Sequence, residues 1–281
     1  MKNKYKKVFS ISLEPGYRNY TVKDIIDLKG KKKLSQILVT SVDEATAAQE
    51  AGIDLLLVPG TLPELRSIRE AASKTFMTIS VPFIKHASKE NAVKKALEIM
   101  EIGADSVHCG SWNLNFMKYL SEFKIPFQGH AGLVPRRSTW IGGVRAFGKT
   151  QKEAIQLYKD IKDIEDTGAW GVEVECVPEK IAGEITKKTS LFTLSIGAGS
   201  ECDGQFLFSE DILGCSNIDF PRHAKKYRDF NKLYAKIQKE RIAAYTEFKK
   251  DVVSQKFPAE KQTVNIDTKE LILFKKFLNK N

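Results

Sequence analysis

Short apolar runs alternate with amphipathic stretches along most of this chain, from residue 36 onward. Most of the runs are almost continuously apolar, as strands of a parallel sheet are when both of their faces are buried. The runs predict eight strands, at residues 36–40, 54–58, 76–80, 105–108, 125–129, 171–175, 191–196 and 211–213.

The stretches between the runs have the spacing of amphipathic helices. Helices are predicted at residues 43–51, 88–102 and 150–167, and each is followed at once by a glycine. Ser88 and Thr150 stand where hydroxyl side chains cap helices, and a glycine just after a helix suits a left-handed cap. Eight strands alternating with helices predict a (β/α)8 barrel. A doubly wound dinucleotide fold is not favoured, because no G-x-G-x-x-G follows the first strand.

The 281 residues are enough for one barrel with an extension at each end. We expect an N-terminal extension at residues 1–20, the barrel at 21–220 and a C-terminal helical extension at 221–281. The last region carries a long helical pattern at 224–253 and a short amphipathic one at 270–278. Because its apolar residues recur at helical spacing, we expect this region to belong with the barrel and to contribute to an oligomer interface.

The net charge of +10 comes from the two ends of the chain. Residues 1–35 carry +7, residues 221–281 carry +9, and the remainder carries −6. Basic ends fit a nucleic-acid binder, but no zinc-finger or RNA-binding motif is present, so lysine-rich solvated helices are the favoured interpretation. No apolar run approaches the roughly 20 residues of a membrane-spanning helix, and no signal segment is apparent. The four cysteines form no C-x-x-C pair, so we expect a reduced, cytoplasmic protein.

Polar residues at the ends of the predicted strands are the candidates for chemistry, since the active sites of such barrels lie there. Thr61 and Ser80 stand at the ends of the second and third strands. Glu175 ends the sixth strand, and Glu173 faces the same way. Two carboxylates on one face are expected to raise each other's pKa, which suits a general base. A buried glutamate paired with a barrel lysine or arginine would explain the same pattern, so both interpretations remain open.

Two histidines end neighbouring predicted strands, His108 on the fourth and His130 on the fifth. A single histidine is more often structural than catalytic. Together with Glu175, however, they could form a metal site of two histidines and one carboxylate. The loop Gly197-Ala-Gly199 could bind an anion through its backbone N–H groups.

Three longer motifs contain several of these residues: Gly129-His-Ala-Gly-Leu-Val-Pro135, Glu175-Cys-Val-Pro178 and Ile196-Gly-Ala-Gly-(x)3-Asp203-Gly-Gln205. Together they resemble the motifs of the ketopantoate hydroxymethyltransferase family, also called 3-methyl-2-oxobutanoate hydroxymethyltransferases. Supporting similarity is present in Ile141-Gly-Gly143 and in Lys256-Phe-Pro-Ala-Glu260. The resemblance covers about residues 21–263.

The resemblance implies a (β/α)8 barrel of the phosphoenolpyruvate mutase and isocitrate lyase type. It implies an enzyme that transfers a hydroxymethyl unit from 5,10-methylenetetrahydrofolate to a 2-oxo acid chelated by magnesium, a step toward pantothenate. Glu175 matches the base that forms the enolate, and His130 matches a histidine that contacts substrate. The family's ring-like decamers, with C-terminal helices packed between subunits, imply that this chain forms a homo-oligomer.

The chain departs from the family at all three metal-binding carboxylates. Gly60 stands in place of the aspartate of a G-D-S motif, and Ser80 in place of that of D-L-P-F. Residues 107–112 contain no carboxylate where the family has V-K-I-E-G-G, and the lysine of that stretch is His108 here. We therefore expect the family's magnesium site to be lost.

Without magnesium, side chains of the chain itself would stabilise the substrate and its enolate by hydrogen bonds. The residues predicted to do so are Thr61, Ser80, His108 and His130. If the chain binds any metal, a softer ion on His108 or His130 is expected.

Three functions remain open at this point. The retained Glu175 and His130 favour an aldol-type hydroxymethyltransferase with altered substrate or metal use. The lost metal ligands and the basic ends favour a non-catalytic paralogue that binds a small acid or acts as a scaffold. A carbon–carbon lyase of the phosphoenolpyruvate mutase and isocitrate lyase superfamily is the third. We adopt the transferase interpretation.

Overall fold

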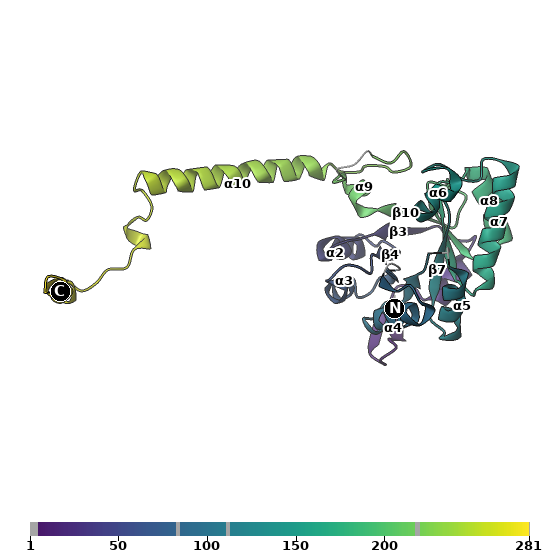
Figure 1. The fold of residues 1–281 in the computed structure, drawn as a ribbon, viewed down its shortest axis with the longest axis horizontal. Helices are drawn as coiled ribbons and strands as arrows, with labels where there is room; N and C mark the ends of the chain where they lie inside the picture. The colour runs from purple at the N-terminus through teal and green to yellow at the C-terminus, as the bar shows by residue number, and fades with distance from the viewer. Residues whose placement is uncertain (1–4, 83–84, 111–112, 217–219, 281) are drawn as a thin grey trace. The chain divides into compact units, whose positions relative to one another are not determined.

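The computed structural model describes residues 5–82, 85–110, 113–216 and 220–280 (Figure 1). The chain divides into two compact units, Met1–Arg228 and Asp229–Asn281. The first unit contains the barrel, and the second is helical.

Eight parallel strands close into the barrel that the alternating pattern predicts (Figure 1). Their order is β10-β3-β4-β5-β6-β7-β8-β9, so strands adjacent in sequence pair and β10 closes onto β3. The strands are β3 (Leu34–Leu38), β4 (Leu55–Val58), β5 (Phe76–Ser80), β6 (Ser106–His108), β7 (Phe127–Gly132), β8 (Gly171–Glu175), β9 (Phe192–Ile196) and β10 (Gly204–Phe208).

The eighth strand is not where the sequence pattern placed it. Residues 211–213 belong to helix α9 (Ser209–Leu213), so that prediction was wrong. The eighth strand is β10, whose Phe206 joins the same apolar cluster as Ile196 of β9. The run at 211–213 is followed by Gly214, which adopts a left-handed φ of 69° and ends the helix.

Helices between the strands cover the outside of the barrel. They are α2 (Val42–Glu50), α3 (Leu65–Ala71), α4 (Lys89–Glu101), α5 (Leu114–Glu122), α7 (Gln151–Asp166) and α8 (Glu179–Lys188). The side chains of Ser88 and Thr150 cap α4 and α7, as predicted. The main apolar core lies between these helices and the strands. Two short helical segments, η2 (Pro135–Arg137) and α6 (Ser138–Ile141), follow β7.

The amino ends of the strands are sealed by an apolar plug. Helix α1 (Val22–Leu28) inserts Ile25, which is fully buried, into a cluster with Phe76 and Phe192. Ligand entry is therefore left to the opposite, carboxyl end of the barrel.

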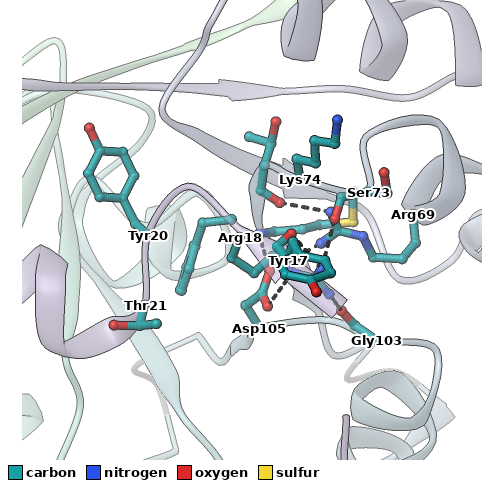
Figure 2. A network of polar contacts seen from close by, with 12 residues as sticks. Tyr17, Arg18, Tyr20, Thr21, Arg69, Ser73, Lys74, Gly103 and Asp105 are labelled. Carbon is teal, nitrogen blue, oxygen red and sulfur yellow. Dashed lines mark hydrogen bonds and ion pairs between the residues drawn. The ribbon is translucent and has the colours of Figure 1, made fainter. Parts of the chain in front are cut away.

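An N-terminal hairpin is fastened to this amino end by buried charges (Figure 2). The hairpin pairs β1 (Lys6–Phe9) with β2 (Pro15–Arg18) in antiparallel register. Arg18 donates from Nε to Oδ1 of Asp105 at 2.7 Å, and Nη1 of Arg69 lies 3.1 Å from the other carboxylate oxygen. The segment that the sequence pattern treated as an extension thus shares ion pairs with the barrel.

The second unit consists of α10 (Phe230–Val253), η3 (Glu260–Gln262) and α11 (Thr268–Leu278). The long helix begins later than its predicted start at residue 224, because the Asp229 side chain caps it by accepting a hydrogen bond from the Lys232 N–H. No residue of α10 or α11 is buried within the second unit itself, so an interface role for their apolar residues stays a prediction. Among the described residues, no helix combines the length and apolarity that crossing a bilayer requires.

Candidate functional site

A cavity of about 610 Å³ opens at the carboxyl ends of the strands. The five side chains predicted to bind substrate or take part in catalysis line it, namely Thr61, Ser80, His108, His130 and Glu175, and so does Glu173. They lie near the carboxyl ends of five consecutive strands, β4 to β8. Closure of the barrel therefore brings these predicted candidates to one place.

His130 and Glu175 form a hydrogen-bonded pair in this cavity, with 2.8 Å between Nε2 and Oε2. The parallel register of β7 and β8 sets His130 opposite Glu173 and Gly132 opposite Glu175. Gly132 has a φ of +88°, and a Cβ there would lie 2.3 Å from the carbonyl oxygen of Glu175. Glycine at this position thus allows β7 to run close against the strand end that carries Glu175.

A second histidine–glutamate pair lies beside the first. Glu173 is buried and accepts a hydrogen bond at Oε1 from the Gln128 side-chain amide at 2.8 Å. Its other oxygen, Oε2, lies 3.3 Å from Nε2 of His108. The rings of His108 and His130 are 6.1 Å apart. The two glutamates are therefore paired with histidines rather than with a lysine or arginine, and the sequence pattern gave no sign of Gln128.

Pairing, rather than repulsion between carboxylates, sets the charges of this cluster. Burial alone would raise the pKa of Glu173, but the charge of His108, together with that of His130 and the hydrogen bond from Gln128, lowers it overall. Burial alone would lower the pKa of His130, but its hydrogen bond with Glu175 and the charges of both glutamates raise it overall. The expectation that the two glutamates raise each other's pKa is therefore wrong for Glu173.

The opposite side of the cavity lacks carboxylates where the resemblance would place metal ligands. The Gly60 N–H donates to Oγ of Ser80 at 3.0 Å. A Cβ on residue 60 would lie 1.8 Å from the carbonyl oxygen of Ser80, so this backbone has no room for an aspartate there. The third ligand position is Gly110, and residues 111 and 112 lie outside the described residues. These residues do not fit the magnesium site that the resemblance implies.

One wall of the cavity is apolar, and the sequence reasoning missed it. It is formed by Leu38, Leu57, Ile196, Phe206 and Phe208. These side chains pack in a single cluster at the carboxyl ends of β3, β4, β9 and β10. Such inward positions follow from the two-residue alternation of a strand, but only after the strands themselves are assigned.

Loops beyond the strands complete the cavity with Arg136 of η2, Asp211 of α9 and His223. Cys176 follows Glu175 in a left-handed conformation, with a φ of 49°, and its Sγ lies 3.7 Å from Nδ1 of His223. Burial, reinforced by the charge of Glu175, raises the pKa of the Cys176 thiol and keeps it protonated.

The candidate anion loop Gly197-Ala-Gly199 is not among the residues that line this cavity. Its glycines have φ values of 72° and 83°. A Cβ added to Gly197 would lie 2.9 Å from the His223 side chain, and one added to Gly199 would lie 2.4 Å from the Glu179 side chain. The two glycines therefore allow close packing against these side chains.

The fold and the cavity are those of a (β/α)8-barrel enzyme, because acid–base side chains gather at the carboxyl ends of the strands. Comparison with known proteins narrows this class. The family model described as ketopantoate hydroxymethyltransferase matches residues 60–260. The chain belongs to this family of enzymes.

Individual relatives are similar in sequence to this chain over most of its length. The 3-methyl-2-oxobutanoate hydroxymethyltransferase of Kosmotoga olearia is 34% identical, covering 84% of this chain and 94% of its own. The protein of the same name from Clostridium botulinum is 34% identical, covering 96% of this chain and 94% of its own. A solved structure of a putative phosphonomutase from Burkholderia cenocepacia has a TM-score of 0.53 at 10% identity, covering 66% of this chain and 90% of that one. That last likeness is one of fold alone.

Proposed function

We propose that this chain is a hydroxymethyltransferase that converts a 2-oxo acid into its enolate and joins the C3 carbon to a one-carbon unit. The observation that carries the proposal is the Glu175 carboxylate, which lines the cavity 2.8 Å from His130. The name shared by the relatives, 3-methyl-2-oxobutanoate hydroxymethyltransferase, supports a branched 2-oxo acid as the substrate class.

The two walls of the cavity suit such a substrate. Leu57, Ile196 and Phe206 would contact the branched alkyl group. Ser80 already accepts a hydrogen bond from a backbone N–H, which leaves its own O–H to donate to an oxygen of the acid. Thr61 would donate to a remaining oxygen of the acid, and these hydrogen bonds would stabilise the enolate as negative charge develops.

Glu175 would act as the general base. Because Oε2 is hydrogen-bonded to His130, Oε1 is the oxygen that would take the proton from C3, and the electrons of the C–H bond would move into the enolate. The enolate carbon would then form a bond to the one-carbon unit of 5,10-methylenetetrahydrofolate, the donor that the resemblance implies. The two carbon–nitrogen bonds of that unit would break, and tetrahydrofolate would leave. Water would supply the hydroxyl group, and its remaining proton, with the proton held by Glu175, would pass to the two nitrogens of the departing tetrahydrofolate.

Deuterium exchange tests the first step without the one-carbon donor. The protein is incubated in deuterated water with 3-methyl-2-oxobutanoate, and the loss of the C3 proton is followed by NMR. We expect protein-dependent exchange, slowed by about 10²- to 10⁴-fold in Glu175→Gln. Glu184→Gln is the matched control, because Glu184 is 68% exposed on α8 and should leave the rate unchanged.

Other outcomes separate the alternatives. No exchange in the wild-type chain would favour a non-catalytic protein that binds a small acid, and cleavage of a 2-oxo acid instead of exchange would favour a carbon–carbon lyase. If Glu175 serves only as a buried ion-pair partner, Glu175→Gln should keep its exchange rate and lose about 3–5 kcal/mol of stability. Exchange and the melting temperature are therefore measured on the same samples.

A further inference from the structure

Two imidazoles and one carboxylate converge at the carboxyl ends of three adjacent strands. His108, His130 and Glu173 each offer a ligand atom, and these atoms all lie within 4.8 Å of one another. The residues belong to β6, β7 and β8, and the register of β7 and β8 places His130 directly opposite Glu173. The cluster is therefore built on hydrogen-bonded strands, which hold ligands more rigidly than loops do.

The polar atoms of this cluster are incompletely satisfied within the described residues. Nε2 of His108 is buried and makes no hydrogen bond, although it lies 3.3 Å from Oε2 of Glu173. Gln128 holds the other oxygen of Glu173 by a hydrogen bond of 2.8 Å. This contact orients the carboxylate and leaves Oε2 beside the histidine. Outer hydrogen bonds of this kind commonly orient carboxylates that bind metals.

We propose that His108, His130 and Glu173 bind a divalent transition-metal ion of the zinc type. Two histidines and a glutamate are one of the ligand sets of catalytic zinc, and they leave a further coordination position open. Ligand atoms about 2.1 Å from a tetrahedral ion lie about 3.4 Å from each other. The distance of 3.3 Å between His108 Nε2 and Glu173 Oε2 already matches this separation.

This site differs in both place and chemistry from the magnesium site that the resemblance implies. Magnesium prefers six oxygen ligands, whereas two of the three ligands here are imidazole nitrogens. The positions that would serve magnesium are Gly60 just after β4, Ser80 at the end of β5 and Gly110 just after β6, and none of them is a ligand proposed here. The ion would compete with protons for the imidazole nitrogens, so its uptake should release protons.

Metal binding can be measured directly and without turnover. The full-length protein is stripped with a chelator, desalted and titrated with Zn²⁺ by calorimetry. A parallel titration with Co²⁺ is followed by its visible absorption bands, which report nitrogen and oxygen ligands in a low-coordinate site. We expect about one Zn²⁺ per chain, and no displacement of Zn²⁺ by millimolar Mg²⁺.

Substitutions test which residues are the ligands. His108→Gln and Glu173→Gln should each weaken Zn²⁺ binding by at least about tenfold. His86→Gln is the matched control, because His86 lies outside the cluster and should bind Zn²⁺ as the wild type does. Circular dichroism and melting curves show whether each variant folds. If one of the two does not fold, Zn²⁺ binding by the other tests the site.

Two results would overturn the site: a wild-type chain that binds neither Zn²⁺ nor Co²⁺ at micromolar concentration, or unchanged binding in a folded His108 or Glu173 variant. Metal binding does not depend on the reaction proposed above. Zinc binding without deuterium exchange would count against the transferase proposal alone, and exchange in a chain that binds no zinc would count against the metal site alone.

Discussion

Replacing Asp105 by asparagine should destabilise the barrel strongly, although it removes a single charge. Asp105 joins three parts of the first unit (Figure 2). Its Oδ1 accepts from Arg18 of the hairpin at 2.7 Å, and its Oδ2 accepts from Arg69 of α3 at 3.1 Å and from the Met77 N–H of β5 at 2.9 Å. The side chains of Arg18, Arg69 and Asp105 are only 9%, 6% and 12% exposed.

The expected loss of unfolding free energy follows from the two guanidinium groups that would remain without their carboxylate. Burial lowers the pKa of Arg69 to about 10, and the charge of Asp105 opposes this shift. Asp105→Asn keeps the size of the side chain but leaves both arginines buried without an anion. Breaking a buried ion pair in this way costs about 3–5 kcal/mol. For a unit of this size, that loss corresponds to a melting temperature lower by about 6–20 °C.

Urea unfolding and thermal melting measure the loss. Asp27→Asn is the matched control, because Asp27 pairs with Lys23 on the surface, where the two side chains are 55% and 78% exposed; it should have no measurable effect. Deuterium exchange by folded Asp105→Asn should be retained, since Asp105 precedes β6 at the end of the barrel opposite the cavity. A loss of stability below about 1 kcal/mol would refute the reasoning, because exposed pairs contribute that much at most.

Three further predictions follow from other contacts. Gly60→Ala should destabilise the chain by about 1–3 kcal/mol in urea unfolding, because its Cβ would lie 1.8 Å from a carbonyl oxygen of β5. Burial opposes ionisation of Glu165, but hydrogen bonds from Lys162 and Ser190 lower its pKa to about 2. Its contribution to stability is therefore complete above the unfolded pKa of about 4.3 and is lost as the pH falls toward 2, so Glu165→Gln should flatten the stability curve over that range. Because α10 (Phe230–Val253) buries no residue within its own unit, light scattering should report an oligomer.

Each of these predictions has an opposing result. A Gly60→Ala chain as stable as the wild type would show that β4 and β5 can separate at no cost. An unchanged acid-side slope in Glu165→Gln would assign the acid sensitivity to other carboxylates. A monomer at micromolar concentration would count against an interface on α10.

The alternating pattern and the glycines after helices determined the barrel from the sequence alone. Gly103 and Gly168 follow α4 and α7 with φ values of +99° and +90°, in the left-handed region that glycine adopts most readily. The eighth strand could not be found in this way. A run of three residues before a glycine is equally consistent with a strand and with the last turn of a helix, and only pairing of β10 with β3 and β9 distinguishes them.

The sequence likewise determined which side chains reach the mouth of the barrel, because the position of a residue at a strand end and the two-residue alternation are local properties. Only the tertiary structure decided which of these side chains meet. His108, His130 and Glu173 are far apart in the chain, and the distances between them depend on how β6, β7 and β8 pair. That register is set by closure of the whole barrel. It places a histidine next to each glutamate, and because charge interactions depend on distance, the pKa of Glu173 falls where the sequence pattern predicted a rise.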